Sequence, residues 1–155
     1  MGKFYSTKTY GNDRGLSCAF RQWRADSHCS LIHGYSIGIK LIFECDTLDD
    51  RNWVMDFGGL KDFKNWAEHM FDHTLLVAED DPELDTFIDL DKKGGIVNLR
   101  IVPAVGCERF AEMAWTKLTK LIQKSIKDGT ALNPSVRVKS VEVFEHGANS
   151  AIYEA

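Results

Sequence analysis

Apolar and β-branched residues fill the segment 36–45, which reads Ser-Ile-Gly-Ile-Lys-Leu-Ile-Phe-Glu-Cys with partial alternation of apolar and polar positions. The turn-prone stretch 46–52 follows it. Alternation at a period of two is typical of a half-buried strand. The pattern therefore predicts a β-strand over 36–45.

Two later stretches carry apolar residues at the spacing of an amphipathic helix. The first follows Asp56, whose carboxylate can accept hydrogen bonds from the free amides of a first turn. Its apolar positions are Leu60, Phe63, Ala67, Met70 and Phe71. The second starts near Cys107 and ends before Gly129, a residue suited to a C-terminal cap. Its apolar positions are Phe110, Met113, Ala114, Leu118, Leu121 and Ile122.

The remaining patterned segments predict strands. The segment 86–102 contains Lys-Lys-Gly-Gly between apolar residues, which predicts a hairpin with a glycine turn. The segment 136–144 alternates at its start, and 151–153 is a short apolar stretch. Strands, two helices and strands in this order favour an α+β domain, with an antiparallel sheet and two helices packed on one face. No repeat or linker interrupts the chain, so we expect residues 1–155 to form one domain.

Composition removes several classes of function. The net charge is -4 and no basic run occurs, so nucleic acid is an unexpected partner. No apolar stretch approaches the ~18 residues of a membrane span, and no apolar signal segment follows the N-terminus, so we expect a cytoplasmic protein. The four cysteines include no C-x-x-C pair, which indicates reduced thiols.

Three places carry residues suited to acid–base chemistry. Cys29 precedes His33 by four positions, and a thiol near an imidazole can form a nucleophile, a proton-transfer pair or part of a metal site. Asp72 and His73 end the first predicted helix, and Glu145 follows a predicted strand. Each also has a structural explanation. Cys29 can be a buried thiol, His73 a histidine favoured by the helix dipole, and Glu145 a solvated carboxylate.

Five sequence elements occur together in one order. They are Cys-x-x-x-His-Gly at 29–34, Val-Met-Asp-Phe-Gly-Gly-Leu-Lys at 54–61, Phe-Asp-His at 71–73, Gly-Cys-Glu at 106–108 and Val-Phe-Glu at 143–145. Over roughly residues 15–155 the chain resembles the 6-pyruvoyl-tetrahydropterin synthase and 6-carboxytetrahydropterin synthase family.

This resemblance implies a tunnelling fold, in which trimers close a barrel and two trimers stack into a homohexamer with active sites between subunits. It implies that Cys29 is the base acting on dihydroneopterin triphosphate and that Asp72 and His73 reach in from a neighbouring chain. Glu145 would bind the pterin, because a carboxylate can accept two parallel hydrogen bonds from an amino group and a ring N–H.

The resemblance also implies a zinc ion held by a first-strand histidine and by both histidines of a His-Gly-His motif. His33 matches the first histidine of that motif, but Tyr35 stands at the second, and Arg24 stands near the first-strand position. His28, five residues before His33, is the alternative ligand. The expected metal site therefore comprises His33 and His28.

Three functions follow as hypotheses. The first is a lyase that forms 6-carboxy-5,6,7,8-tetrahydropterin in queuosine (deazapurine) biosynthesis. The second is 6-pyruvoyl-tetrahydropterin synthesis, which shares the base and the pterin anchor. The third is a metal-poor, non-catalytic pterin- or purine-binding protein, a reading motivated by Arg24 and Tyr35.

Overall fold

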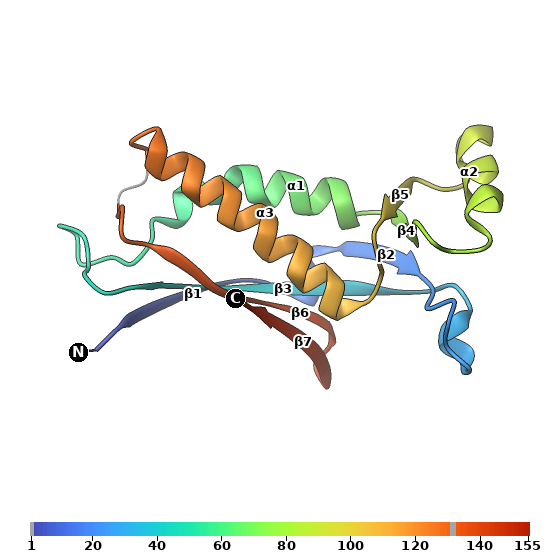
Figure 1. Cartoon of the computed structure of the whole chain (residues 1–155), viewed down its shortest axis with the longest axis horizontal. Helices are drawn as coiled ribbons and strands as arrows, with labels where there is room; N and C mark the ends of the chain where they lie inside the picture. The colour runs from blue at the N-terminus through green and yellow to red at the C-terminus, as the bar shows by residue number, and fades with distance from the viewer. Residues whose placement is uncertain (1, 131–132) are drawn as a thin grey trace.

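The structure, a computed structural model, describes residues 2–130 and 133–155 as one sheet with helices on one face (Figure 1). Its strands are β1 (Phe4–Tyr10), β2 (Leu16–Phe20), β3 (His33–Cys45), β4 (Thr74–Ala78), β5 (Leu99–Val102), β6 (Arg137–His146) and β7 (Asn149–Glu154). Its α-helices are α1 (Lys61–Phe71), α2 (Leu84–Lys93) and α3 (Cys107–Lys127).

The seven strands run in the order β5-β4-β2-β3-β6-β7, and β1 also pairs with β3. Most neighbours are antiparallel, but β2 with β4 and β4 with β5 are parallel. The predicted α+β class is confirmed, and the expectation of a purely antiparallel sheet is corrected to a mixed one. Parallel neighbours need a long crossover, and α2 supplies one between β4 and β5.

Helices α1 and α3 pack side by side on one face of the sheet, as predicted (Figure 1). α1 contacts β2 and β4, whereas α3 lies over β6 and β7. The predicted apolar stripes supply the core between the layers, where Phe63, Phe71, Phe110 and Leu118 are at most 1% exposed. Burial of these faces is the main source of helix stability here.

The predicted helix ends are found. Asp56 accepts a hydrogen bond from the Gly58 amide at 2.9 Å and caps a 3-10 turn, Phe57–Leu60, that leads into α1. Gly129 has a φ of +72° and donates its N–H to the Ile126 carbonyl just after α3. Because this φ favours glycine, the chain turns there at little cost.

The predicted hairpin over 86–102 is wrong. Its first part belongs to α2. Its last part, Leu99–Val102, is β5, which pairs with β4 and not with the segment directly before the glycines. Phe87 is 6% exposed and packs with Leu75 and Val77 of β4, and that burial stabilises a helix. Gly94 and Gly95, each with a φ of +74°, end the helix instead of turning a hairpin.

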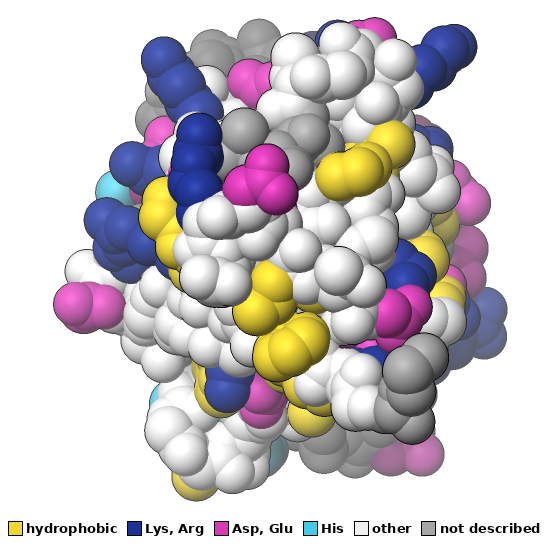
Figure 2. Space-filling model, turned by 90° about the vertical axis from the view of Figure 1, so that its left-hand side faces the viewer, with side chains coloured by type: hydrophobic (Ala, Val, Ile, Leu, Met, Phe, Trp, Pro, Cys, Tyr) yellow, Lys and Arg dark blue, Asp and Glu magenta, His cyan; other side chains and the backbone are white. Residues whose placement is uncertain are grey.

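Figure 2 shows the left-hand end of the molecule, where hydrophobic side chains emerge among charged ones. An open hollow of about 520 Å³ is lined in part by Phe4 and Tyr5 of β1 and by Trp53 of the loop after β3. These three side chains are 45–53% exposed. Within the described residues, no helix is long and apolar enough to cross a membrane.

Candidate active site

Cys29 lies on a short 3-10 turn, His28–Ser30, between β2 and β3. The Ser27 hydroxyl accepts a hydrogen bond from the Cys29 amide at 3.3 Å, and the Cys29 carbonyl accepts from the Gln22 amide at 2.9 Å. Both bonds use the Cys29 backbone, and the thiol is half-buried. The turn therefore positions the sulfur while leaving it accessible to a small molecule.

Arg21 connects this turn to the loop after β4. Its guanidinium donates to both carboxylate oxygens of Asp81, at 2.9 and 2.6 Å, and to the Ser30 carbonyl at 3.5 Å. The Asp81 side chain is only 1% exposed, and the Arg21 hydrogen bond holds its pKa below the usual value. A bidentate pair of this kind is directional, so Arg21 is a positioning residue for the Cys29 turn.

His33 lies at the start of β3, opposite Phe20 of β2 in the strand register. Its Nδ1 is 2.8 Å from the Leu31 carbonyl oxygen. A carbonyl only accepts hydrogen bonds, so Nδ1 is the donor of this bond, and in the neutral ring Nε2 is then a hydrogen-bond acceptor. The rings of Phe20 and Tyr35 are 5.2 and 5.6 Å from the His33 ring, centroid to centroid.

Glu145 lies near the end of β6, at a break in the register with β7. Such a bulge turns a side chain away from the regular ladder. Asn12 holds this part of β6 through side-chain hydrogen bonds to the carbonyls of Phe144 and Glu145, each at 3.4 Å, and to that of Ser36 at 2.8 Å. Glu145 is thus held at the sheet end, as the sequence predicted.

The Glu145 charge contributes to the pKa shifts of two residues from other segments, Tyr35 of β3 and Cys107 of α3. Burial, and then the Glu145 charge, raises the pKa of Tyr35, with a further contribution from Cys29. Burial, and then the Glu145 charge, also raises the pKa of Cys107, the first residue of α3, to about 12. Tyr35 and Cys107 are therefore neutral at pH 7. The Tyr35 ring lies 5.6 Å from the His33 ring and 6.4 Å from the ring of His146, the residue after Glu145.

Asp72 and His73 lie on an exposed turn after α1, and their side chains form a pair with Oδ1 and Nδ1 at 2.5 Å. The His73 amide donates to the Ser17 carbonyl at 2.7 Å, whereas the Cys29 carbonyl accepts a hydrogen bond from the Gln22 amide. Ser17 lies in β2, and Gln22 lies beyond the end of that strand, five positions later. Within one chain, no hydrogen bond among the described residues joins this pair to Cys29.

The described residues do not fit the zinc site that the resemblance implies. No three His, Cys, Asp or Glu side chains among them lie close enough together to hold a metal ion. His28 is exposed on the turn beside Cys29. Arg24 lies beyond the end of β2, with its guanidinium 4.0 Å from the Trp23 ring centre and 3.2 Å from Asp80, so its assignment to the first strand is corrected. The strand position beside His33 belongs to Phe20.

Sequence reasoning missed three residues of this site: Phe20, Cys107 and the Tyr35 hydroxyl. The alternation of Leu16, Cys18 and Phe20 was a usable signal, because it predicts that Phe20 is the last inward position of a strand. Cys107 was assigned only to the start of a helix. Its proximity to Glu145 depends on the packing of α3 against β6, which is not local in sequence.

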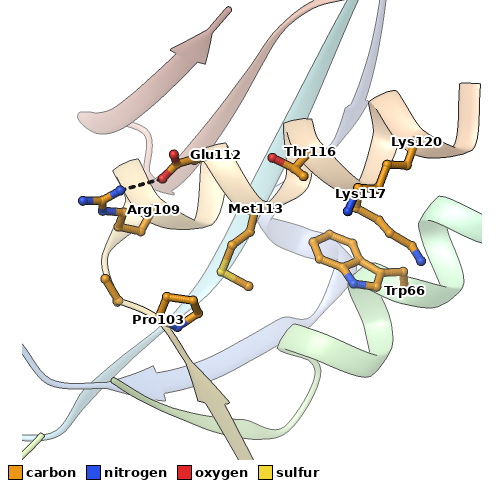
Figure 3. Close-up of a pocket in the computed structure, with 9 residues that line it drawn as sticks. Trp66, Pro103, Arg109, Glu112, Met113, Thr116, Lys117 and Lys120 are labelled. Carbon is orange, nitrogen blue, oxygen red and sulfur yellow. Dashed lines mark hydrogen bonds and ion pairs between the residues drawn. The ribbon is translucent and has the colours of Figure 1, made fainter. Parts of the chain in front are cut away.

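A second hollow, of about 610 Å³, lies away from all of these residues (Figure 3). It is lined by Trp66 of α1, by the loop after β5 and by one face of α3. Figure 3 shows Trp66 and Met113 on its apolar side, and Arg109 paired with Glu112 at 2.8 Å at one end. None of its lining residues is a predicted site residue. A hollow of similar size, about 630 Å³, is lined in part by Ile32 and by the predicted site residue His73.

The mixed sheet, the two helices on one face and the thiol and carboxylate at the sheet end define a tunnelling-fold protein of the α+β class. A family model described as 6-pyruvoyl tetrahydropterin synthase matches residues 12–155. The chain therefore belongs to this family of lyase enzymes.

The relatives agree with this assignment. The chain is 24% identical over 143 residues to the 6-carboxy-5,6,7,8-tetrahydropterin synthase of Aquifex aeolicus, covering 90% of this chain and 84% of that protein. It is 32% identical to the enzyme of that name from Rickettsia conorii over 62 residues, or 39% of this chain and 45% of that protein. The match to the Rickettsia protein thus spans less than half of its length.

Solved structures show the same fold. An uncharacterized protein from Wolinella succinogenes superposes with a TM-score of 0.78 at 20% identity, covering 99% of both chains. The 6-pyruvoyl tetrahydropterin synthase of Plasmodium falciparum superposes with a TM-score of 0.64 at 15% identity, over 99% of this chain and 98% of the other.

Proposed function

We propose that the chain is a carbon–carbon lyase that converts dihydroneopterin triphosphate and water into 6-carboxy-5,6,7,8-tetrahydropterin, acetaldehyde and triphosphate, a step toward queuosine. Two relatives aligned over most of this chain, from Aquifex aeolicus and Helicobacter pylori, carry the name of this activity. The observation that carries the proposal is the location of the Tyr35 ring, which lies 5.6 Å from the His33 ring and 6.4 Å from the ring of His146, the residue after Glu145.

The proposed roles follow from the chemistry of each group. The half-buried Cys29 thiol acts as the base that moves a proton on the substrate side chain, since a thiolate is both basic and nucleophilic. Glu145 binds the pterin through its amino group and ring N–H. Burial raises the pKa of the Cys107 thiol and keeps it protonated at neutral pH.

The proposal includes a homo-oligomer, a trimer or hexamer with active sites between subunits. The support is that no hydrogen bond among the described residues joins the Asp72–His73 pair to Cys29 within one chain. Both Asp72 and His73 are exposed, and they are held rigidly by their mutual bond and by Ser17. Such a pair is suited to complete the site of a neighbouring copy.

Product analysis tests the proposal. The purified protein is incubated with dihydroneopterin triphosphate under reducing, anaerobic conditions, and pterins, acetaldehyde and triphosphate are measured by mass spectrometry and enzymatic assay. We expect acetaldehyde and triphosphate in equal amounts. Triphosphate without acetaldehyde would instead support 6-pyruvoyl-tetrahydropterin synthesis. Saturable pterin binding with no product would support the binding-protein hypothesis and contradict the lyase.

A further inference from the structure

The corner of the site beside Cys29 is aromatic. Phe20 is 2% exposed and is fixed edge-on against Phe110 of α3, with ring centres 5.2 Å apart. His33 and Tyr35 pack on the outer side of Phe20, at 5.2 and 6.1 Å. Three rings from two paired strands thus occupy the place where a metal would need ligands.

Two of these three rings are poor metal donors. Phe20 has no donor atom, and a neutral Tyr35 phenol is a much weaker zinc ligand than a histidine nitrogen. A catalytic zinc site takes three protein ligands and an open position. His33 supplies one nitrogen here, and the part of the chain that the structure describes offers no cluster that completes the set.

The two polar rings of this corner, His33 and Tyr35, can instead form hydrogen bonds with a bound molecule. His33, with its proton on Nδ1 directed to Leu31, presents Nε2 as a hydrogen-bond acceptor. The Tyr35 phenol is a hydrogen-bond donor, and the two rings are edge-on at 5.6 Å. One acceptor beside one donor can accept the O–H of a hydroxyl group and donate to one of its lone pairs.

We propose that this chain binds no resident zinc and that His33 and Tyr35 together bind a hydroxyl of the substrate side chain. The first part concerns the protein alone. The second part rests on the proposed function, because it takes the polyhydroxylated side chain of a pterin as the occupant.

Metal binding tests the first part without any assay of activity. Elemental analysis of protein purified with zinc in the medium, followed by titration with Co²⁺, is expected to show far less than one ion per chain and no tetrahedral cobalt spectrum. The double variant Phe20→His/Tyr35→His restores the three-histidine pattern and is expected to bind about one Co²⁺ per chain with that spectrum. Stoichiometric, tight zinc in the wild-type protein would overturn this part.

Phe20 is in the core, so the double variant could fail to fold. The single variant Tyr35→His changes only a half-buried position. The Co²⁺ titration of the wild-type protein tests the absence of a metal site without any variant. Circular dichroism identifies an unfolded variant before its metal content is interpreted.

Kinetics of Tyr35→Phe test the second part. This change keeps the ring that packs on Phe20 and His33 and removes only the hydroxyl. We expect kcat/KM to fall at least tenfold with an unchanged melting temperature, and wild-type turnover to survive a metal chelator. The matched control is Tyr153→Phe, a ring packed on Trp115 far along β7, with no expected effect.

An unchanged kcat/KM in Tyr35→Phe, or loss of wild-type turnover in the chelator with recovery on adding zinc, would overturn the second part. A wild-type protein that produces no product at all would refute the proposed lyase, while the metal titration would still decide the first part. The two failures are therefore distinguishable.

Discussion

Asp72 and His73 form a pair in which the imidazole Nδ1 lies 2.5 Å from the carboxylate Oδ1, on a turn where His73 has a φ of +55°. A non-glycine residue adopts this left-handed conformation at a cost in energy, and such residues cluster at functional sites. The His73 side chain is nevertheless 86% exposed. The pair is thus fixed in place while facing away from its own chain.

Mixing two inactive variants tests whether this pair serves a neighbouring subunit. Cys29→Ala and His73→Ala should each lose most activity. After the two proteins are denatured together and reassembled at equal concentration, about one quarter of shared sites should contain both native groups. Recovered turnover, measured against each variant alone, checks this. Recovery to no more than the level of the separate variants would mean that both groups act within one chain.

Glu145→Gln should weaken substrate binding more than it slows the chemical step. A carboxamide replaces one acceptor oxygen with a donor group, so it cannot receive two parallel N–H bonds from a pterin. We expect KM to rise by about 10-fold or more with a smaller change in kcat. Glu142→Gln is the control on the same strand, since Glu142 accepts a hydrogen bond from Ser150 at 2.6 Å. A loss confined to kcat would contradict the anchoring role.

Cys29 should be the first thiol to react with iodoacetamide in the native protein. It is half-buried, whereas Cys18, Cys45 and Cys107 are buried. Alkylation mapped by peptide mass spectrometry should reach Cys29 at least about tenfold faster than the others, because exposure and thiolate character control this reaction. Turnover should fall in parallel with Cys29 modification. Faster labelling of a buried thiol would argue against an accessible base at position 29.

The free energy of unfolding should fall above about pH 9, because two buried thiols keep their protons only in the folded chain. Burial raises the pKa of Cys18 and of Cys107 from 9.0 to about 12. Between these values the unfolded chain has lost protons that the folded chain still binds, so the free energy of unfolding decreases as pH rises. Urea unfolding at pH 8, 9 and 10 measures this. Cys107→Ser should make this decrease between pH 9 and 10 shallower, and an unchanged slope would contradict the assignment.

Asp81→Asn should loosen the turn that carries Cys29. It breaks the paired interaction with Arg21 at a side chain that is 1% exposed, and we expect a loss of about 1–3 kcal/mol in the free energy of unfolding. The neighbouring Asp80 provides a matched control, since its side chain is 54% exposed and its bonds to Trp23 and Arg24 lie at the surface. Asp80→Asn should cost less than about 0.5 kcal/mol in the same urea titration.

Local patterns were sufficient for both long helices and for β3, β6 and β7, but they did not predict β1, β2, β4 or α2. Both long helices, their caps and the strand that ends at Glu145 follow from periodicity and end signals within a few residues. The segment 84–102 was not decided locally, because Gly94 and Gly95 suit a hairpin turn and a helix end equally well. The packing of Phe87 on Leu75 and Val77 resolves the choice, and those partners lie about ten residues away.

Some features of the candidate site also depend on local sequence, and others depend on how the strands pair. Cys29, Glu145 and the Asp72–His73 pair were predicted from their sequence context, and their roles stay predictions. The ring contacts of Phe20 with His33 and Tyr35 could not be predicted, because they require the register that pairs Phe20 with His33. Arg24 lies only four positions from Phe20 in sequence, but it is past the strand end and bonded to Asp80.

The pairing of β1 with β3 and of β6 with β7 leaves one outer edge on β1 and another on β7 in the described sheet. Beyond β4, strand β5 forms a third outer edge. A second copy could continue the sheet by joining its β1 to this β7, or the reverse. Joining unlike edges repeats the same contact around an axis, so such an assembly either closes as a ring or grows without limit. The curvature of this sheet then sets how many copies a closed ring contains.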